Sequence, residues 1–162
     1  MPMPCYLQIT GTTQGKIEGS VAIQGRQGQI LVQAEDTLIE IPRNVETGLP
    51  VGKRVHGPFK ITKEIDKSSP KIFQALTSGE QLTEVLLEFT RISPAGKEEK
   101  YYTIKLQNAI VVSLRKWVPN CFDQETKMLG HMEDVCFTYE HVTWSYTPDG
   151  IEADDNWLAP KT

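Results

Sequence analysis

Apolar and polar residues alternate along much of this chain, with the period of two that is typical of half-buried β-strands. Residues 5–10 and 59–66 alternate in this way, and two longer alternating segments occupy residues 82–92 and 101–114. The sequence SPAGKE lies between the two longer segments, and its proline and glycine suit a type I turn. We therefore expect the two longer segments to form a β-hairpin.

The alternation also predicts which side chains face the core. In the longest segment only Asn108 interrupts the apolar row, which indicates a β-bulge. The apolar parity changes between Tyr139 and Val142, so we expect a bulge or two buried faces there. Phe89 and Trp144 fall on the core side, where truncation to Ala would cost ~3–5 kcal/mol. The core-facing residues predicted in the longest segment are Tyr102, Ile104, Leu106, Ile110, Val112 and Leu114.

One short segment departs from the β pattern and predicts a helix over residues 70–78. Ser69 precedes it as a candidate N-cap, because its hydroxyl can accept a hydrogen bond from a free backbone N–H of the first turn. Pro70 suits the first helical position, where a missing N–H costs nothing. Gly79 suits the left-handed conformation just past the end.

This helix must be held by packing, because a helix of about nine residues is marginal alone in water. The apolar residues Ile72, Phe73 and Leu76 lie on one side of two turns and predict the face that docks on the sheet. Gln74 would then point outwards, towards solvent or a neighbouring subunit. We expect a packing and assembly element and not part of an active site.

Three other stretches contain residues that interrupt the β-strand alternation. Residues 42–58 contain three prolines and three glycines without sustained alternation, and long loops of this kind are usually functional or disordered. Residues 11–28 hold five glycines around a short predicted strand at Val21 and Ile23. A predicted strand region over residues 30–41 is broken at Glu35 and Asp36. Loops and turns therefore separate many short strands.

Together these elements predict a mainly β protein with one short flanking helix. About seven strands fit a compact β-barrel or two packed antiparallel sheets. The helix can cover an opening or an exposed edge of the sheet. With 162 residues the chain is long enough for one domain with its own core, so we expect residues 1–162 to form a single domain.

Composition and charge narrow the function. The formal net charge is −4 and the basic residues form only short clusters, whereas nucleic acids and anionic membranes select a concentrated basic face. No stretch approaches the ~20 apolar residues that span a bilayer, and the N-terminus lacks the basic and apolar regions of a signal peptide. We expect cytoplasmic assembly, no nucleic acid, no membrane insertion, and any export without a cleavable signal.

No group of residues has the spacing of a familiar catalytic or metal site. The three cysteines contain no C-x-x-C pair, and His131 with Glu133 lacks the downstream cysteines of a zinc deaminase. Residues 48–53 are one residue short of a phosphate loop. We therefore predict no enzyme, no cofactor and no metal. A β-fold enzyme or a monomeric ligand-binding β-barrel is the alternative, and the mass in solution distinguishes them from an assembly.

Four stretches, in order along the chain, resemble the haemolysin-coregulated protein family, Hcp, the tube subunit of the bacterial type VI secretion system. They are PCYLQITGTTQGKIEGS, HGPFKITKEIDKSSPKIFQALTSGE, GKEEKYYTIKLQNAIVVSLRKWVPNC and HVTWSYTPDGIEADDNW. The resemblance implies a fold related to phage tail-tube proteins and a ring-shaped homohexamer. It also implies that rings stack into a secreted hollow tube inside a contractile sheath, behind the spike protein VgrG, with small effectors in the lumen.

The resemblance also suggests which residues meet a neighbouring subunit. In the family, the loop that matches residues 42–58 is extended and contributes to subunit contacts, whereas the residues alone allow a mobile surface loop. Some relatives carry a fused toxin domain, and the sequence beyond Trp157 leads us to expect no fused effector domain here. The candidate subunit-contact residues are Arg43, Glu46, Lys53, Arg54, His56, Gln74 and Trp117, of which Trp117 could equally lie at the edge of the core.

Overall fold

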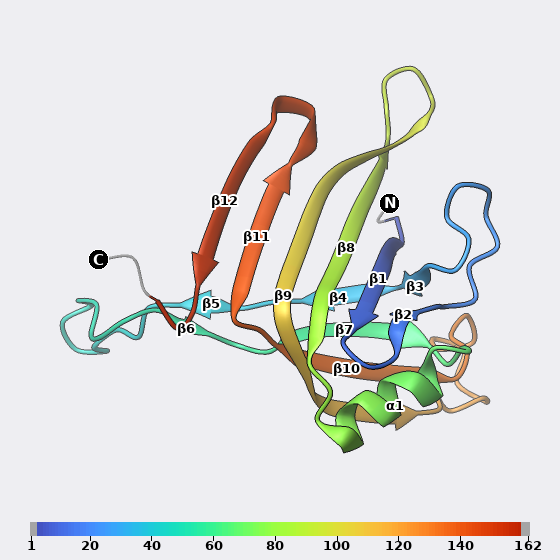
Figure 1. Ribbon diagram of the computed structural model, residues 1–162, viewed down its shortest axis with the longest axis horizontal. Helices are drawn as coiled ribbons and strands as arrows, with labels where there is room; N and C mark the ends of the chain where they lie inside the picture. Colours follow the sequence, from blue (N-terminus) through green and yellow to red (C-terminus); the bar gives the residue numbers. More distant parts are fainter. Residues whose placement is uncertain (1–2, 160–162) are drawn as a thin grey trace.

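A computed structural model describes residues 3–159 of the chain. Within these residues it contains one α-helix, α1 (Ser69–Ser78), one short 3₁₀ helix, η1 (Thr147–Asp149), and strands β1 to β12 (Figure 1). The strands are β1 (Cys5–Gly11), β2 (Gly15–Ile17), β3 (Ile30–Val32), β4 (Ala34–Asp36), β5 (Ile39–Glu40), β6 (Val55–His56), β7 (Phe59–Glu64), β8 (Leu82–Ile92), β9 (Glu98–Trp117), β10 (Met132–Thr138), β11 (His141–Tyr146) and β12 (Ile151–Asn156).

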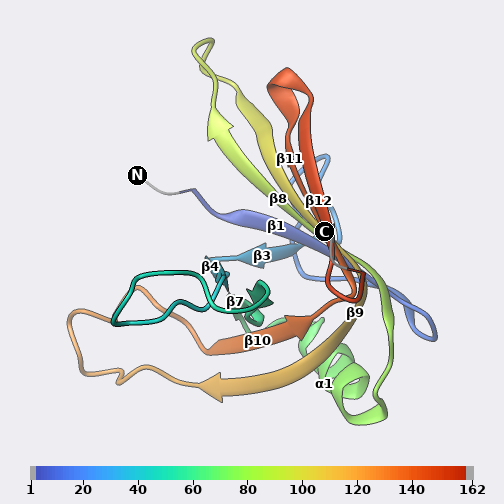
Figure 2. The ribbon, with the colours of Figure 1, turned by 90° about the vertical axis from the view of Figure 1, so that its left-hand side faces the viewer.

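Ten of these strands form two antiparallel sheets that share the long strand β9, and β5 pairs separately with β6. The first half of β9 pairs with β8 and β11, and its second half pairs with β10. The first sheet continues from β8 to β1, which carries both β2 and β3, and from β11 to β12. The second sheet continues from β10 to β7 and β4. Figure 2 shows β9 bending from one sheet into the other. The sheets do not close into a barrel within residues 3–159, so the second of the two expected forms is confirmed.

The main core lies between the two sheets. Leu7, Val85 and Leu106 come from the first sheet, Ile61 and Phe137 come from the second, and all five are 0% exposed. Burial of a large apolar side chain contributes ~1.5–3 kcal/mol, so this interior supplies most of the energy that holds the sheets together. The predicted hairpin is confirmed, because β8 and β9 pair across the turn at residues 93–96.

The irregularity predicted at Asn108 is present, but it reverses the faces beyond it. Asn108 has a φ of 53°, in the left-handed region. Ala109 and Val111 are buried after it, whereas Ile110 is 40% exposed and Val112 is 47% exposed. The prediction that Ile110 and Val112 face the core is therefore wrong, because β9 changes sheet at this point. A one-residue change of phase moves every following side chain to the other face.

The apolar parity change after Tyr139 has a similar cause. The two alternating segments are separate strands, β10 and β11, and they pair with different halves of β9. The short strand expected at Val21 and Ile23 is absent from the described chain, and Ile23 is 54% exposed. Strand β12 lies on the edge of the first sheet, and the alternation did not predict it.

The helix is present, but it is rotated from the predicted orientation. Its buried residues are Ser69, Ile72 and Ala75, whereas Phe73 is 55% exposed. Successive helical residues are separated by about 100°, so a face built on positions 69, 72 and 75 turns Phe73 away from the sheet. The small side chain of Ala75 lets the helix approach β9 closely. The expected core contact of Phe73 is therefore wrong, and that of Ile72 is confirmed.

The prediction for the C-terminal end of the helix is confirmed, and the prediction for its N-cap is wrong. Gly79 has a φ of 67° and its N–H bonds to the Leu76 carbonyl, so the predicted left-handed C-terminus is confirmed. At the other end the helix begins at Ser69, and the N-cap is Ser68, whose side chain makes no capping hydrogen bond. The predicted capping role of Ser69 is wrong, because Ser69 lies inside the first turn and its hydroxyl oxygen accepts from the Lys63 ammonium and from the Asp66 N–H, which precedes the helix. The hydroxyl proton is donated to the Glu133 carboxylate, whose Oε1 lies 2.7 Å away.

That carboxylate belongs to a buried charged network that the alternation did not reveal. Lys63, on β7, is 0% exposed and its Nζ lies 2.6 Å from Glu133 Oε1 on β10. The same ammonium donates to Asp66 Oδ1 at 3.0 Å and to the Ser69 hydroxyl at 3.3 Å. Glu133 is also 0% exposed, and its Oε2 has no hydrogen-bond partner among residues 3–159. The network fixes the start of α1 to the second sheet.

Candidate functional site: the base of the projecting arm

The long loop at residues 42–58 projects from the body of the molecule as an arm (Figure 1). Strands β5 and β6 pair at its base, and a single bridge joins Arg43 to Pro50 further out. At the tip, the Asn44 side chain accepts a hydrogen bond from the Glu46 N–H at 2.8 Å, and the Gly48 N–H donates to the Asn44 carbonyl at 2.8 Å. The arm therefore has its own internal hydrogen bonds, as expected of an ordered loop.

Four side chains attach the base of the arm to the body. The Arg54 guanidinium binds both carboxylate oxygens of Asp155, with 2.8 Å between Nη2 and Oδ1. It also donates to the Asn156 carbonyl at 2.8 Å. His56 lies 2.8 Å from Asp155 through Nε2 and 2.7 Å from the Tyr139 hydroxyl through Nδ1. Paired hydrogen bonds between arginine and a carboxylate are among the strongest in proteins, so this cluster fixes the arm to β12.

The electrostatics of the cluster follow from these contacts. The hydrogen bond from Arg54 is the largest cause that lowers the pKa of Asp155 below its ordinary value of 3.8. The hydrogen bond from His56 lowers the pKa further, whereas burial of the carboxyl raises it. Burial, with the Asp155 charge nearby, raises the pKa of Tyr139 to about 12. Asp155 is therefore ionised and Tyr139 neutral at neutral pH, as the hydrogen bonds require.

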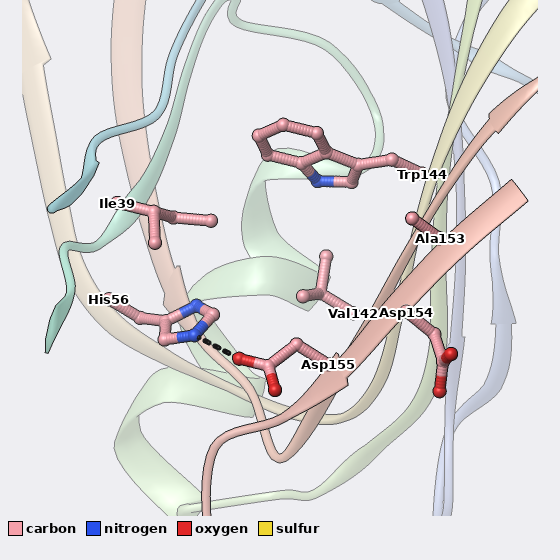
Figure 3. A pocket seen from close by; sticks show the side chains of 7 residues that line it. All are labelled: Ile39, His56, Val142, Trp144, Ala153, Asp154 and Asp155. Atoms are coloured by element: carbon pink, nitrogen blue, oxygen red, sulfur yellow. Dashed lines mark hydrogen bonds and ion pairs between the residues drawn. The ribbon is translucent and has the colours of Figure 1, made fainter. Parts of the chain in front are cut away.

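A small pocket lies beside the cluster, between the arm and the β11–β12 hairpin (Figure 3). Ile39 from the arm faces Trp144 and Val142 from β11 across it, while Asp154 points away. Its volume is 170 Å³, below the ~300–1,000 Å³ of a typical small-molecule site. Trp144 covers this pocket and is 38% exposed, so its predicted place in the core is wrong.

The cluster is poorly suited to acid–base catalysis. His56 is only 5% exposed and both of its ring nitrogens are engaged by protein groups, so neither can reach a substrate proton. Within residues 3–159 no group of three or more His, Cys, Asp and Glu side chains could hold a metal ion. In the same part of the chain no helix has the length and apolar character to cross a membrane. The geometry supports anchoring of the arm.

The structure brings together only some of the predicted contact residues. Arg54 and His56 meet at the base of the arm, whereas the other five lie apart from that cluster. Arg43, Glu46 and Lys53 are exposed further along the arm, and Gln74 is exposed on the outer side of α1. Trp117 is half-buried at the end of β9, with the Arg115 guanidinium 5.9 Å from its ring. Their roles in subunit contacts stay predictions.

The sequence did not reveal the partners of Arg54 and His56. Tyr139 appeared there only as part of an alternating apolar row, and Asp155 had no predicted role. Asp155 lies 101 residues beyond Arg54 along the chain. The spacing Arg54-x-His56 places two potential hydrogen-bond donors on one side of an extended segment, and this was the available signal for an acidic partner.

We expect the cluster to make stability depend on pH in the acid range. The pKa of Asp155 is lower in the folded protein than its ordinary value of 3.8. Its contribution to the free energy of unfolding is therefore fully present above pH 3.8 and is lost as the pH falls through the lower pKa of the folded state. Asp155→Asn should cost about 1.5–3 kcal/mol at pH 7 and should flatten the acid limb of the stability curve. Urea unfolding between pH 2.5 and 7, a range of about 4.5 pH units chosen to bracket this carboxyl, measures both effects.

Asp36→Asn is the matched control, because Asp36 is exposed and makes no ion pair within the described residues. It should leave the stability at pH 7 within about 0.5 kcal/mol of the wild type. An Asp155→Asn protein as stable as this control at pH 7 would show that the cluster does not hold the arm.

Comparisons with protein families and with solved structures identify relatives of this chain. The family model described as "Type VI secretion system effector, Hcp" matches residues 6–146. The "Major exported protein" of Pseudomonas aeruginosa is 41% identical over 169 residues, which cover 99% of this chain and 98% of that protein. The solved Hcp1 protein from E. coli EAEC 042 superposes with a TM-score of 0.85 at 36% identity, covering 96% of this chain and 99% of that one. Another structure, described as "Crystal structure of Hcp protein", gives 0.89 at 29% identity, covering 95% and 97%.

The fold and these matches define the class: this is a protein of the type VI secretion system. The chain belongs to the Hcp family, whose members are structural tube proteins of that system, and the resemblance seen in the sequence is confirmed. Membership of this family makes it a secreted protein that associates with itself.

Proposed function

We propose that six copies of this chain form a closed ring and that the rings stack into the inner tube of a type VI secretion system. The tube is surrounded by the contractile sheath, is tipped by the spike protein VgrG, and carries small effector proteins in its lumen. The rings assemble in the cytoplasm and are then exported by this secretion system. The chain acts as one structural domain without a catalytic, cofactor or metal role.

The observation that carries this proposal is the apolar surface of the arm. Six apolar side chains along the arm and its base are at least 46% exposed, although a monomer would gain stability by covering them. They are Leu38, Ile41, Val45, Leu49, Val51 and Val55. Contiguous exposed apolar surface marks interaction sites in soluble proteins. The arm is also ordered by its own hydrogen bonds and fixed at its base, which lowers the entropic cost of binding.

A ring explains why such an arm is kept on only one side of the molecule. In a closed ring each copy presents one surface to the next copy and a different surface to the previous one. The competing function, a monomeric ligand-binding β-barrel, is less well supported, because the sheets do not close in the described part of the chain and the arm-base pocket is small. An enzyme is less well supported because both nitrogens of His56 are engaged.

We expect light scattering coupled to size exclusion to give six times the chain mass of 18.2 kDa, about 109 kDa, at micromolar concentrations. Replacing Val45 and Leu49 by Glu places two charges on the apolar arm and should reduce the mass to that of a folded monomer. Circular dichroism and thermal melting establish that the variant is folded.

Ile92→Glu is the matched control, because Ile92 is 57% exposed at the far end of the β8–β9 hairpin, away from the arm. It should keep the mass of the wild-type ring. A wild-type protein that remains monomeric at all concentrations tested would contradict the proposed ring.

A further inference from the structure

One buried oxygen atom in the charged network at the start of α1 has no donor. Glu133 is 0% exposed, and its Oε1 lies 2.6 Å from the Lys63 ammonium and accepts from the Ser69 hydroxyl at 2.7 Å. Its Oε2 has no hydrogen-bond partner in the described part of the chain. Buried polar atoms are nearly always hydrogen-bonded to protein or to ordered water, and an unsatisfied charged group is the most costly exception. This oxygen therefore requires a donor.

The protein groups around Glu133 have no donor to spare. The Lys63 ammonium has three N–H bonds. It is already within hydrogen-bond distance of more acceptors than that, because Asp66 Oδ1 lies at 3.0 Å, the Ser69 hydroxyl at 3.3 Å and the carbonyl of the next residue at 2.9 Å, in addition to Glu133 Oε1. The Ser68 N–H and hydroxyl both donate to Asp66 Oδ1. A turn of any of these groups towards Oε2 would break an existing hydrogen bond.

A proton or a metal ion is a poor match for this position. A proton on Glu133 would remove the negative charge that faces the Lys63 ammonium at 2.6 Å, and the new O–H would itself need an acceptor. The ammonium already occupies the position between the Glu133 and Asp66 carboxylates that a cation would take. Within residues 3–159 no group of three or more His, Cys, Asp and Glu side chains could hold a metal ion. A neutral donor satisfies Oε2 and leaves the charges as they are.

The surroundings select a very small donor. Glu133 and Ser68 are 0% exposed and Ser69 is 1% exposed, so the position is closed to bulk solvent and to large ligands. A water molecule is small, donates and accepts, and typically makes about three hydrogen bonds to buried polar groups. The Ser68 hydroxyl donates its proton to Asp66 and so keeps its lone pairs as acceptors. The network is therefore polar enough to bind water.

We propose that Glu133 Oε2 binds one internal water molecule, which completes the network of Lys63, Glu133, Asp66 and Ser69. The water donates one hydrogen to Oε2, while Lys63 and Ser69 donate to Oε1. Both carboxylate oxygens are then held, which keeps the carboxylate oriented towards the start of α1. The site lies within one chain, so this inference does not depend on the proposed ring.

High-resolution crystallography of the whole chain tests the site directly. The wild type should show a water peak about 2.5–3.0 Å from Glu133 Oε2, the range of an O–H···O hydrogen bond. Glu133→Gln should keep the peak, because its amide retains a polar atom at this position, whereas Lys63→Met with Glu133→Leu should lose it. Wild-type density without the peak, with a metal ion in its place or with a protein donor turned onto Oε2, overturns the proposal. The wild-type density decides the outcome even if a variant fails to fold.

Magnetic relaxation dispersion of the solvent provides an independent measurement, because it detects internal waters that exchange slowly. The wild type should hold about one more such water per chain than Lys63→Met with Glu133→Leu. Lys105→Met removes a lysine from an exposed pair with Glu84 and is the matched control, which should keep the wild-type value. Equal values for the wild type and the double variant would contradict the proposed site, as would an equal loss in the control.

Discussion

Lys63→Met should destabilise the monomer by about 3–5 kcal/mol, because it leaves Glu133 charged, buried and without its cation. Both side chains are 0% exposed, and the distance between Nζ and Oε1 is 2.6 Å. Glu133→Leu should also destabilise, but by less, since the Lys63 ammonium keeps its hydrogen bonds to Asp66 and to the Glu64 carbonyl. Urea unfolding at one fixed protein concentration gives both free energies.

The double variant separates the value of the pair from the cost of breaking it. Replacing both partners by apolar residues of similar size is often neutral or stabilising for buried ion pairs. We therefore expect Lys63→Met with Glu133→Leu to recover most of the loss of Lys63→Met alone. Losses that simply add in the double variant would show that the two charges do not interact.

Lys105→Met is the matched control for the buried pair. Lys105 lies 3.8 Å from Glu84 in another cross-strand pair, but the two side chains are 39% and 42% exposed. Exposed ion pairs contribute about 0–1 kcal/mol, so this variant should unfold almost as the wild type does. A loss at Lys105 equal to the loss at Lys63 would mean that burial does not set the cost.

Phe137→Ala should also cost about 3–5 kcal/mol, as expected for a large aromatic side chain lost from a packed core. Phe137 is 0% exposed on β10 and its ring centre lies 6.2 Å from that of Phe59. Removal of the ring leaves a cavity between the two sheets, which the backbone of β10, paired on both sides, cannot close. Urea unfolding and thermal melting measure the loss.

Two other phenylalanines serve as exposed controls for the loss of the buried Phe137 ring. Phe122 is 90% exposed in the loop between β9 and β10, and Phe73 is 55% exposed on α1. Phe122→Ala should change the free energy of unfolding by no more than about 0.5 kcal/mol, and Phe73→Ala should cost far less than Phe137→Ala. If Phe73→Ala were as damaging as Phe137→Ala, α1 would have to lie in the orientation that the sequence first suggested.

The sequence was most informative where local pattern decides the structure. Alternation with a turn between two segments predicted the β8–β9 hairpin, because strand period and turn chemistry depend on neighbours a few residues away. Gly79 predicted the end of α1, since a left-handed residue is needed there. Asn108 marked the irregular point of β9. The ordered resemblance over nearly the whole chain predicted the Hcp family, which the family match confirmed.

Local pattern failed where the outcome depends on distant partners. The alternation gives two faces to each strand but does not say where a strand changes sheet, so Ile110 and Val112 were placed on the wrong side of β9. The helical pattern predicted Phe73 against the sheet, but Ala75 is buried there and Phe73 is exposed. The close approach to β9 decided for the smaller side chain.

What the sequence alone determined is thus the class of fold, the succession of its main elements and the family. Only the tertiary structure decided which charges are buried and what holds the arm. In the sequence Lys63 looks like an ordinary strand lysine, but in the fold β10 places Glu133 beside it. Arg54 likewise looks like a loop cation, but β12 places Asp155 beside it. The physical reason is that an ion pair depends on distance in space, and these partners lie about 70 and 101 residues apart along the chain.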